Sequence, residues 1–184
     1  MKLLVIGDLH SYAAMATNNF ESANVSESQN VKNDPRHMML GYLPHPNNLK
    51  VSWGLKLSEL LKMNYEVYAS ETDADKIRYA NEFIDYNDNL FLIMGFNLNN
   101  SDVSIFNFHL ILNERKINHL FYNIDKQHTS QYDFKGCYMD DAYIEYLQSN
   151  GHEPVITSNT YFGTEAHADW SINILKYIVN KGIM

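Results

Sequence analysis

The first eleven residues, Met1–Ser11 with the sequence MKLLVIGDLHS, decide how the rest of the chain is interpreted. A short apolar run, Leu3–Ile6, is followed at once by the polar stretch GDLHS. A continuous run of branched apolar residues that ends at a glycine is typical of a buried strand in a parallel sheet. Residues after such a strand lie at its carboxyl end, where ligands bind in open α/β sheets. We therefore expect Asp8, His10 and Ser11 at a potential active-site rim.

Composition limits the number of domains and the class of partner. A chain of 184 residues fits one domain, 1–184, and 45% hydrophobic with 20% charged residues is typical of a globular protein. The formal net charge is −8, and only 14 Lys and Arg residues are spread along the chain. Phosphate backbones and anionic membranes attract clustered basic residues. We therefore expect neither nucleic acid nor a membrane surface as a partner.

Cysteine usage and hydropathy indicate the compartment. A single cysteine, Cys137, excludes an internal disulfide and favours a reducing environment. The apolar run before Asp8 is too short for the core of a signal peptide, and no run has the length of a membrane span. We predict a cytoplasmic protein, located in the host cytoplasm or the virion if a phage encodes it.

Apolar periodicity predicts strands that alternate with helices along the chain. Ser52 and Thr72 stand where helix caps are expected, and a long loop at about 11–50 follows the first strand, with a short helix expected within Tyr12–Phe20. This order predicts an α/β fold, a three-layer α/β/α sandwich with a mostly parallel five-stranded sheet. The expected strands are 3–6, 65–69, 90–94, 119–124 and 154–157, and the expected helices are 53–62, 72–86, 101–116, 140–151 and 165–180.

On these features the chain resembles the SGNH (GDSL-like) hydrolases, which are single three-layer α/β/α domains of this size. The resemblance extends over nearly the whole chain in order and spacing. The chain is especially similar to the small members of the family found in bacteriophage genomes. It implies an ester hydrolase fold with a nucleophile after the first strand. The segments that carry it are Ile6–Ser11, Trp53–Leu61, Glu66–Ala69, Ile93–Asn97 and His167–Ser171.

The residues that carry the chemistry of that family are replaced here. The resemblance places the family's nucleophile at Leu9, its acid at Asn159 and its catalytic base at Tyr161. Leucine has no lone pair, asparagine stabilises an imidazolium poorly, and a phenol with a pKa of about 10 is a poor base at neutral pH. The family's oxyanion-binding glycine has no counterpart around Ser70–Thr72, where Glu71 would repel an oxyanion, so only Asn97 is kept as an oxyanion donor. The resemblance therefore implies a fold without its catalytic residues.

Two catalytic alternatives use other residues of the same stretch. In an active esterase or deacetylase, Ser11 would attack, with His167 as base and Glu165 as its acid partner, although His167 would then lie within a helix start. In a metallophosphoesterase, Asp8 and His10 would bind metal ions, but the later metal-binding motifs of that family are missing. Neither alternative is supported by as many residues as the degenerate fold.

The remaining reactive residues show no pattern of a site. We interpret Trp53 and Trp170 as core residues, Gly95 as permitting the turn after the third strand, and Cys137 as non-catalytic. We therefore expect no cofactor and no metal. The resulting hypothesis is a catalytically degenerate SGNH-like module that binds another protein through the rim and the 11–50 loop. The histidines without ligand spacing, expected to be scattered on the surface or half-buried, are His37, His45, His109, His119, His128 and His152.

Overall fold

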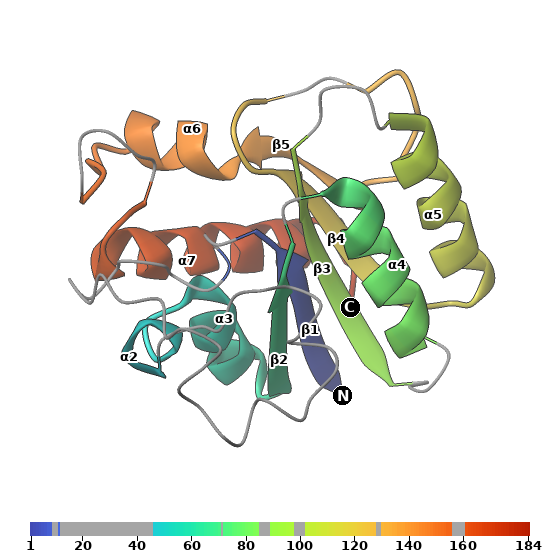
Figure 1. Ribbon diagram of the computed structural model, residues 1–184, viewed down its shortest axis with the longest axis horizontal. Helices are drawn as coiled ribbons and strands as arrows, with labels where there is room; N and C mark the ends of the chain where they lie inside the picture. Colours follow the sequence, from blue (N-terminus) through green and yellow to red (C-terminus); the bar gives the residue numbers. More distant parts are fainter. Residues whose placement is uncertain are drawn as a thin grey trace.

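A computed structural model gives the structure of the chain, and it describes residues 1–8, 11, 46–70, 72–84, 89–97, 102–127, 130–155 and 161–184. Five parallel strands form one sheet in the order β2-β1-β3-β4-β5 (Figure 1). This confirms the α/β fold with a parallel five-stranded sheet. The strands are β1 (Lys2–Gly7), β2 (Asn64–Ala69), β3 (Leu90–Phe96), β4 (Asn118–Asn123) and β5 (Tyr138–Ala142).

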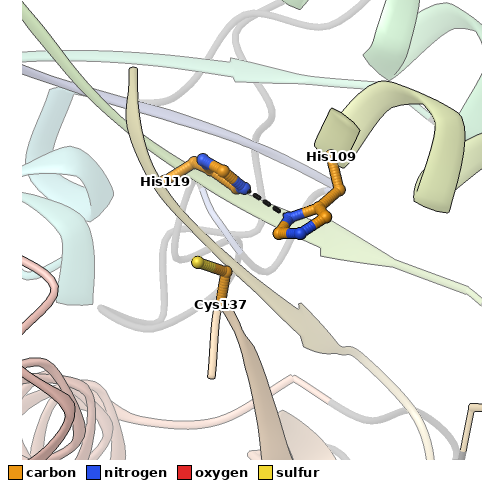
Figure 2. Close-up of side chains that lie close together, drawn as sticks. All are labelled: His109, His119 and Cys137. Atoms are coloured by element: carbon orange, nitrogen blue, oxygen red, sulfur yellow. Dashed lines mark hydrogen bonds between the residues drawn. The ribbon is translucent and has the colours of Figure 1, made fainter. Parts of the chain in front are cut away.

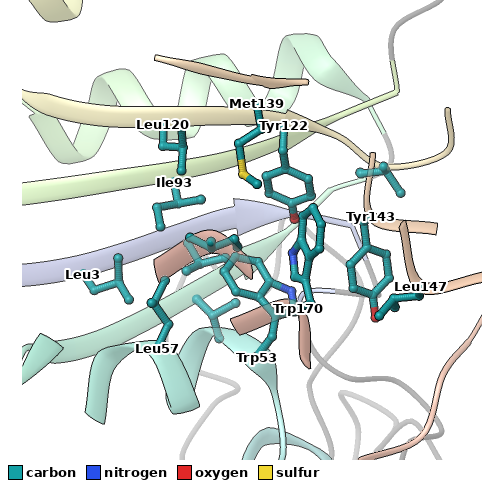
Figure 3. Packing of buried hydrophobic residues seen from close by; sticks show 14 of the residues in the cluster. Leu3, Trp53, Leu57, Ile93, Leu120, Tyr122, Met139, Tyr143, Leu147 and Trp170 are labelled. Atoms are coloured by element: carbon teal, nitrogen blue, oxygen red, sulfur yellow. The ribbon is translucent and has the colours of Figure 1, made fainter. Parts of the chain in front are cut away.

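Alternate side chains of the buried strands build the two faces of the sheet. From β1, Leu3 and Val5 pack with α3 (Trp53–Leu61), α6 (Tyr143–Ser149) and α7 (Thr164–Lys181), as Figure 3 shows for part of this core. Leu4 and Ile6 pack with α4 (Asp73–Ile84) and α5 (Asp102–Glu114) on the opposite face. Because helices cover both faces of the sheet, the side chains on both sides of β1 and β3 are buried, and the sequences of these strands are continuous apolar runs.

Two helix starts follow the predicted capping residues. Ser52 accepts a hydrogen bond from the Leu55 N–H at 3.3 Å and begins α3. Thr72 Oγ1 accepts the Asp75 N–H at 3.2 Å and donates to the Asp75 carboxylate at 2.8 Å, at the start of α4. Each cap satisfies a backbone N–H that the helix leaves without an internal partner.

The fifth strand is Tyr138–Ala142, so our prediction of a strand at 154–157 is wrong. Pro154 forms only an isolated antiparallel bridge, because a proline has no N–H to donate to a ladder, and 156–157 lie outside the described residues. Asp140 and Asp141, which we expected to begin a helix, are exposed on β5. The last strand of a sheet tolerates such charges, and α6 follows it directly.

The expected 11–50 loop lies largely outside the described residues. Its described end contains α2 (Pro46–Leu49), a short helix that the sequence did not predict. The helix expected within 12–20 is not among the described residues. Of the helices that the structure describes, none combines the length and the hydropathy needed to cross a membrane.

Candidate functional site

Polar side chains meet at the carboxyl end of β1. In the strand order, β2 lies on one side of β1 and β3 on the other, so the chain changes direction across the sheet at this point. Asp8 follows β1, and its carbonyl oxygen accepts the N–H of Ser11 at 3.0 Å. Tyr122 stands near the end of β4, Tyr143 begins α6, and His167 lies in the first turns of α7. We call these five residues the carboxyl-edge cluster.

Two glycines make room for Tyr122 at this edge. Gly95 lies inside β3 opposite Tyr122, and a Cβ on it would be 2.6 Å from the Tyr122 ring. A Cβ on Gly7 would overlap Ser11 Oγ and lie 3.4 Å from the Tyr122 hydroxyl. Our prediction that Gly95 permits a turn after the strand is therefore wrong, because the strand continues through Gly95 to Phe96. The missing side chains allow the Tyr122 ring to cross the sheet face.

The tyrosines of the cluster are held in their protonated form. Burial raises the pKa of Tyr122, and the negative charge of Asp8 adds to this effect while the neighbouring Ser11 hydroxyl opposes it. Burial also raises the pKa of Tyr143, with Tyr122 and Asp8 acting in the same direction. A phenol with a raised pKa keeps its proton at neutral pH, so neither tyrosine is suited to act as a general base.

The residues of the proposed esterase alternative do not form a catalytic relay. Ser11 is fully buried, and among the described residues its Oγ has no hydrogen-bond partner of normal geometry. His167 is 1% exposed, whereas Glu165 is exposed two positions earlier in the same helix. Residues two apart on a helix face different directions. The structure thus brings Ser11 and His167 to the same edge of the sheet without a nucleophile–base hydrogen bond.

A second polar group joins β3 to α4 at the same edge. Asp73 Oδ1 accepts the Asn97 N–H at 3.2 Å and the Lys76 ammonium at 3.0 Å. The side chain of Lys76 is fully buried and that of Asp73 is 10% exposed. Sequence reasoning missed Asp73 and Lys76, because a lysine on a helix is interpreted as solvent-exposed unless a partner is known. Their spacing of three residues was the available signal.

Several predicted site residues lie outside the part of the chain that the structure describes. These include Leu9, His10, Asn159 and Glu71, so their roles stay predictions. Asp8 is half-buried, as is Tyr161, whose carbonyl oxygen accepts the Val155 N–H at 2.8 Å. Asn97 follows β3, and within the described residues its Oδ1 is buried without a hydrogen-bond partner.

A separate cluster contains His109, His119 and Cys137 (Figure 2). Their ligand atoms all lie within 4.8 Å of one another, and both histidines are 1% exposed. Our expectation of scattered surface or half-buried histidines is therefore wrong for these two. Among the described residues, this is the only group of three His, Cys, Asp or Glu side chains placed to bind a metal, and it does not include Asp8. The three residues come from separate elements, so no sequence spacing indicates them.

Comparison with protein-family models, with curated proteins and with solved structures found no match for this chain.

Proposed function

We propose that the chain is a catalytically degenerate SGNH-hydrolase-like module that binds another protein. The observation that carries this proposal is the state of Ser11, whose buried Oγ has no hydrogen bond to a base within the part of the chain that the structure describes. A serine nucleophile needs a base within hydrogen-bond reach. The sequence resemblance supports the same conclusion, because it places Leu9 at the nucleophile position.

The outer face of α5 supports a protein partner. Val103, Leu110 and Ile111 are 55%, 49% and 38% exposed, and their spacing places them on one side of the helix. The other side of α5 is buried in the core through Ile105 and Phe108. A helix that is apolar on both sides is typical of one covered on both sides. The proposed partner surface therefore extends from the carboxyl edge along α5.

Catalysis is tested with short-chain p-nitrophenyl esters and a fluorophosphonate label on the purified chain. We expect no turnover and no labelling. Ser11→Ala, His167→Ala and Glu165→Gln are assayed in parallel, with thermal melting to show that each variant is folded. Glu165 is exposed, so Glu165→Gln tests the proposed relay without disturbing the core. Turnover that is lost in folded Ser11→Ala and Glu165→Gln would contradict the proposal and establish the esterase.

Binding is tested by capture of partners on immobilised protein. Leu110→Asp changes the α5 surface, whereas Leu60→Asp changes a similarly exposed leucine, at 52%, on α3. We expect one partner to be retained by the wild type and by Leu60→Asp, and to be lost with Leu110→Asp. Equal retention by both variants would exclude α5 as the partner surface.

A further inference from the structure

We propose that His109, His119 and Cys137 bind a zinc ion that links α5, β4 and the segment before β5. This inference is independent of the proposed function, because zinc binding by these three residues requires neither a protein partner nor the loss of catalysis. His119 is the second residue of β4, and Cys137 immediately precedes β5, so both mark the amino ends of their strands. Figure 2 shows His109 and His119 joined by the hydrogen bond between their rings, with Cys137 close by.

The distances are close to those of a tetrahedral zinc site. Zinc bonds of about 2.0–2.1 Å to nitrogen and about 2.3 Å to sulfur put two nitrogen ligands about 3.3 Å apart, and nitrogen and sulfur about 3.5 Å apart. His109 Nδ1 and His119 Nε2 are 2.8 Å apart, and all three ligand atoms lie within 4.8 Å. The rings therefore separate by about half an ångström, and the thiol approaches by about 1.3 Å at most. Side-chain rotation supplies shifts of this size.

The hydrogen bonds orient His119 as a metal ligand. Its Nδ1 lies 2.8 Å from the Ile117 carbonyl oxygen, which can only accept, so Nδ1 carries the proton. With the proton on Nδ1, Nε2 carries the lone pair, which in the absence of metal accepts a hydrogen bond from His109. A metal-binding histidine usually donates its other N–H to a carbonyl or carboxylate in this way. His119 thus has the tautomer that zinc needs.

His109 requires one change of tautomer. It donates from Nδ1 to His119 Nε2, and its Nε2 accepts from the Asn113 amide at 2.8 Å. On zinc binding the proton moves to Nε2, and the exposed Asn113 side chain turns to present its oxygen. Zinc binds the thiolate form of cysteine, so Cys137 loses its thiol proton when the metal binds. Each zinc ion bound therefore releases one proton, from Cys137.

The surroundings favour a borderline-soft ion in a largely apolar site. The rings of Phe121 and Phe134 lie 5.1 Å from His119 and 5.2 Å from His109, respectively. Two imidazole nitrogens and a thiolate select zinc over magnesium or calcium, which prefer oxygen ligands. Cys137 is half-buried, so the ion and a fourth ligand, a water molecule, enter from its side. The ion would join three elements that are separate in the sequence, so its expected effect is on the stability of the fold.

The test uses the full-length protein after metal removal with a chelator. Zinc at a hundredfold excess over its Kd is expected to raise the Tm by about 5–10 °C for a chain of this size. Cobalt is expected to give a thiolate charge-transfer band in the near ultraviolet, which reports a sulfur ligand directly. Cys137→Ala removes both effects, and it is expected to fold because Cys137 is only half-buried. His152→Gln, a change at a half-buried histidine that pairs with Asp169, retains both effects.

The outcomes are decisive in both directions. A zinc-dependent rise in Tm, together with a cobalt–thiolate band that is lost in Cys137→Ala and retained in His152→Gln, supports the site. The absence of a cobalt–thiolate band in the wild type overturns it. A zinc effect of equal size in Cys137→Ala and the wild type also overturns it, because the ion then binds elsewhere. None of these results depends on ester hydrolysis or on a protein partner.

Discussion

Gly95→Ala is the substitution whose effect the structure predicts most directly. The added methyl group would lie 2.6 Å from both Cζ and the hydroxyl oxygen of Tyr122, and 3.0 Å from Cε2. The Tyr122 ring cannot withdraw easily, because Trp53 and Trp170 pack against it with ring centroids at 5.7 and 5.6 Å. All four residues are buried in the core. Overpacking of this kind costs about 1–3 kcal/mol of unfolding free energy.

The size of the effect makes it measurable by calorimetry or by chemical denaturation. For a chain of this size, each kcal/mol lowers the Tm by about 2–4 °C, so Gly95→Ala is expected to lower the Tm by about 2–12 °C. Gly163→Ala is the matched control. Its new methyl group would be 3.9 Å from the nearest atom, on Val155, and its φ of −78° suits an alanine. We expect Gly163→Ala to change the stability by less than about 1 kcal/mol.

A double-mutant cycle shows whether Tyr122 causes the loss. Tyr122→Leu removes the ring atoms that the methyl group would meet, although it leaves a cavity that is itself destabilising. In that background, Gly95→Ala is expected to cost about 1–2 kcal/mol less than in the wild type. An unchanged Tm for Gly95→Ala, or an equal cost in both backgrounds, would refute the packing argument.

Two further predictions concern buried polar groups. Lys76→Met leaves the Asp73 carboxylate without its ammonium partner and is expected to cost about 3–5 kcal/mol in denaturant unfolding. Asp73→Asn with Lys76→Met keeps an oxygen for the Asn97 N–H and is expected to recover most of that loss, whereas a stable single variant would contradict the argument. Burial raises the pKa of Tyr177 to about 12, above the unfolded value of 10, so its contribution is complete below pH 10 and is lost as the pH rises toward 12. Tyr177→Phe loses the hydrogen bond to the Tyr138 carbonyl and is less stable at pH 7. Its deficit, measured by chemical unfolding across the pH range, is expected to shrink between pH 10 and pH 12, and a constant deficit would exclude this ionisation.

The carboxyl-edge cluster and the proposed zinc site lie at different ends of the same sheet. The carboxyl-edge cluster lies where β1 ends, and its described members are buried or half-buried. The His109–His119–Cys137 cluster lies at the amino ends of β4 and β5. Substitutions at one cluster are therefore expected to leave the other intact, because energetic coupling weakens between residues without shared contacts.

Part of the candidate site could be predicted from the sequence. The apolar run of β1 and the polar stretch after it placed Asp8 and Ser11 at the carboxyl edge, where the structure finds them. The sequence did not predict the burial of Ser11 or its position beside Tyr122. That position depends on the space above Gly7 and Gly95, which only the assembled sheet creates.

The amino-acid sequence by itself determined the order of most strands and helices and the caps at Ser52 and Thr72. These features depend on apolar periodicity and on hydrogen bonds between residues a few positions apart, so they can be read along the chain. Only the tertiary structure decided that Tyr138–Ala142 completes the sheet and that His109, His119 and Cys137 meet. These arrangements depend on contacts between separate elements, and neighbouring residues carry no record of such contacts.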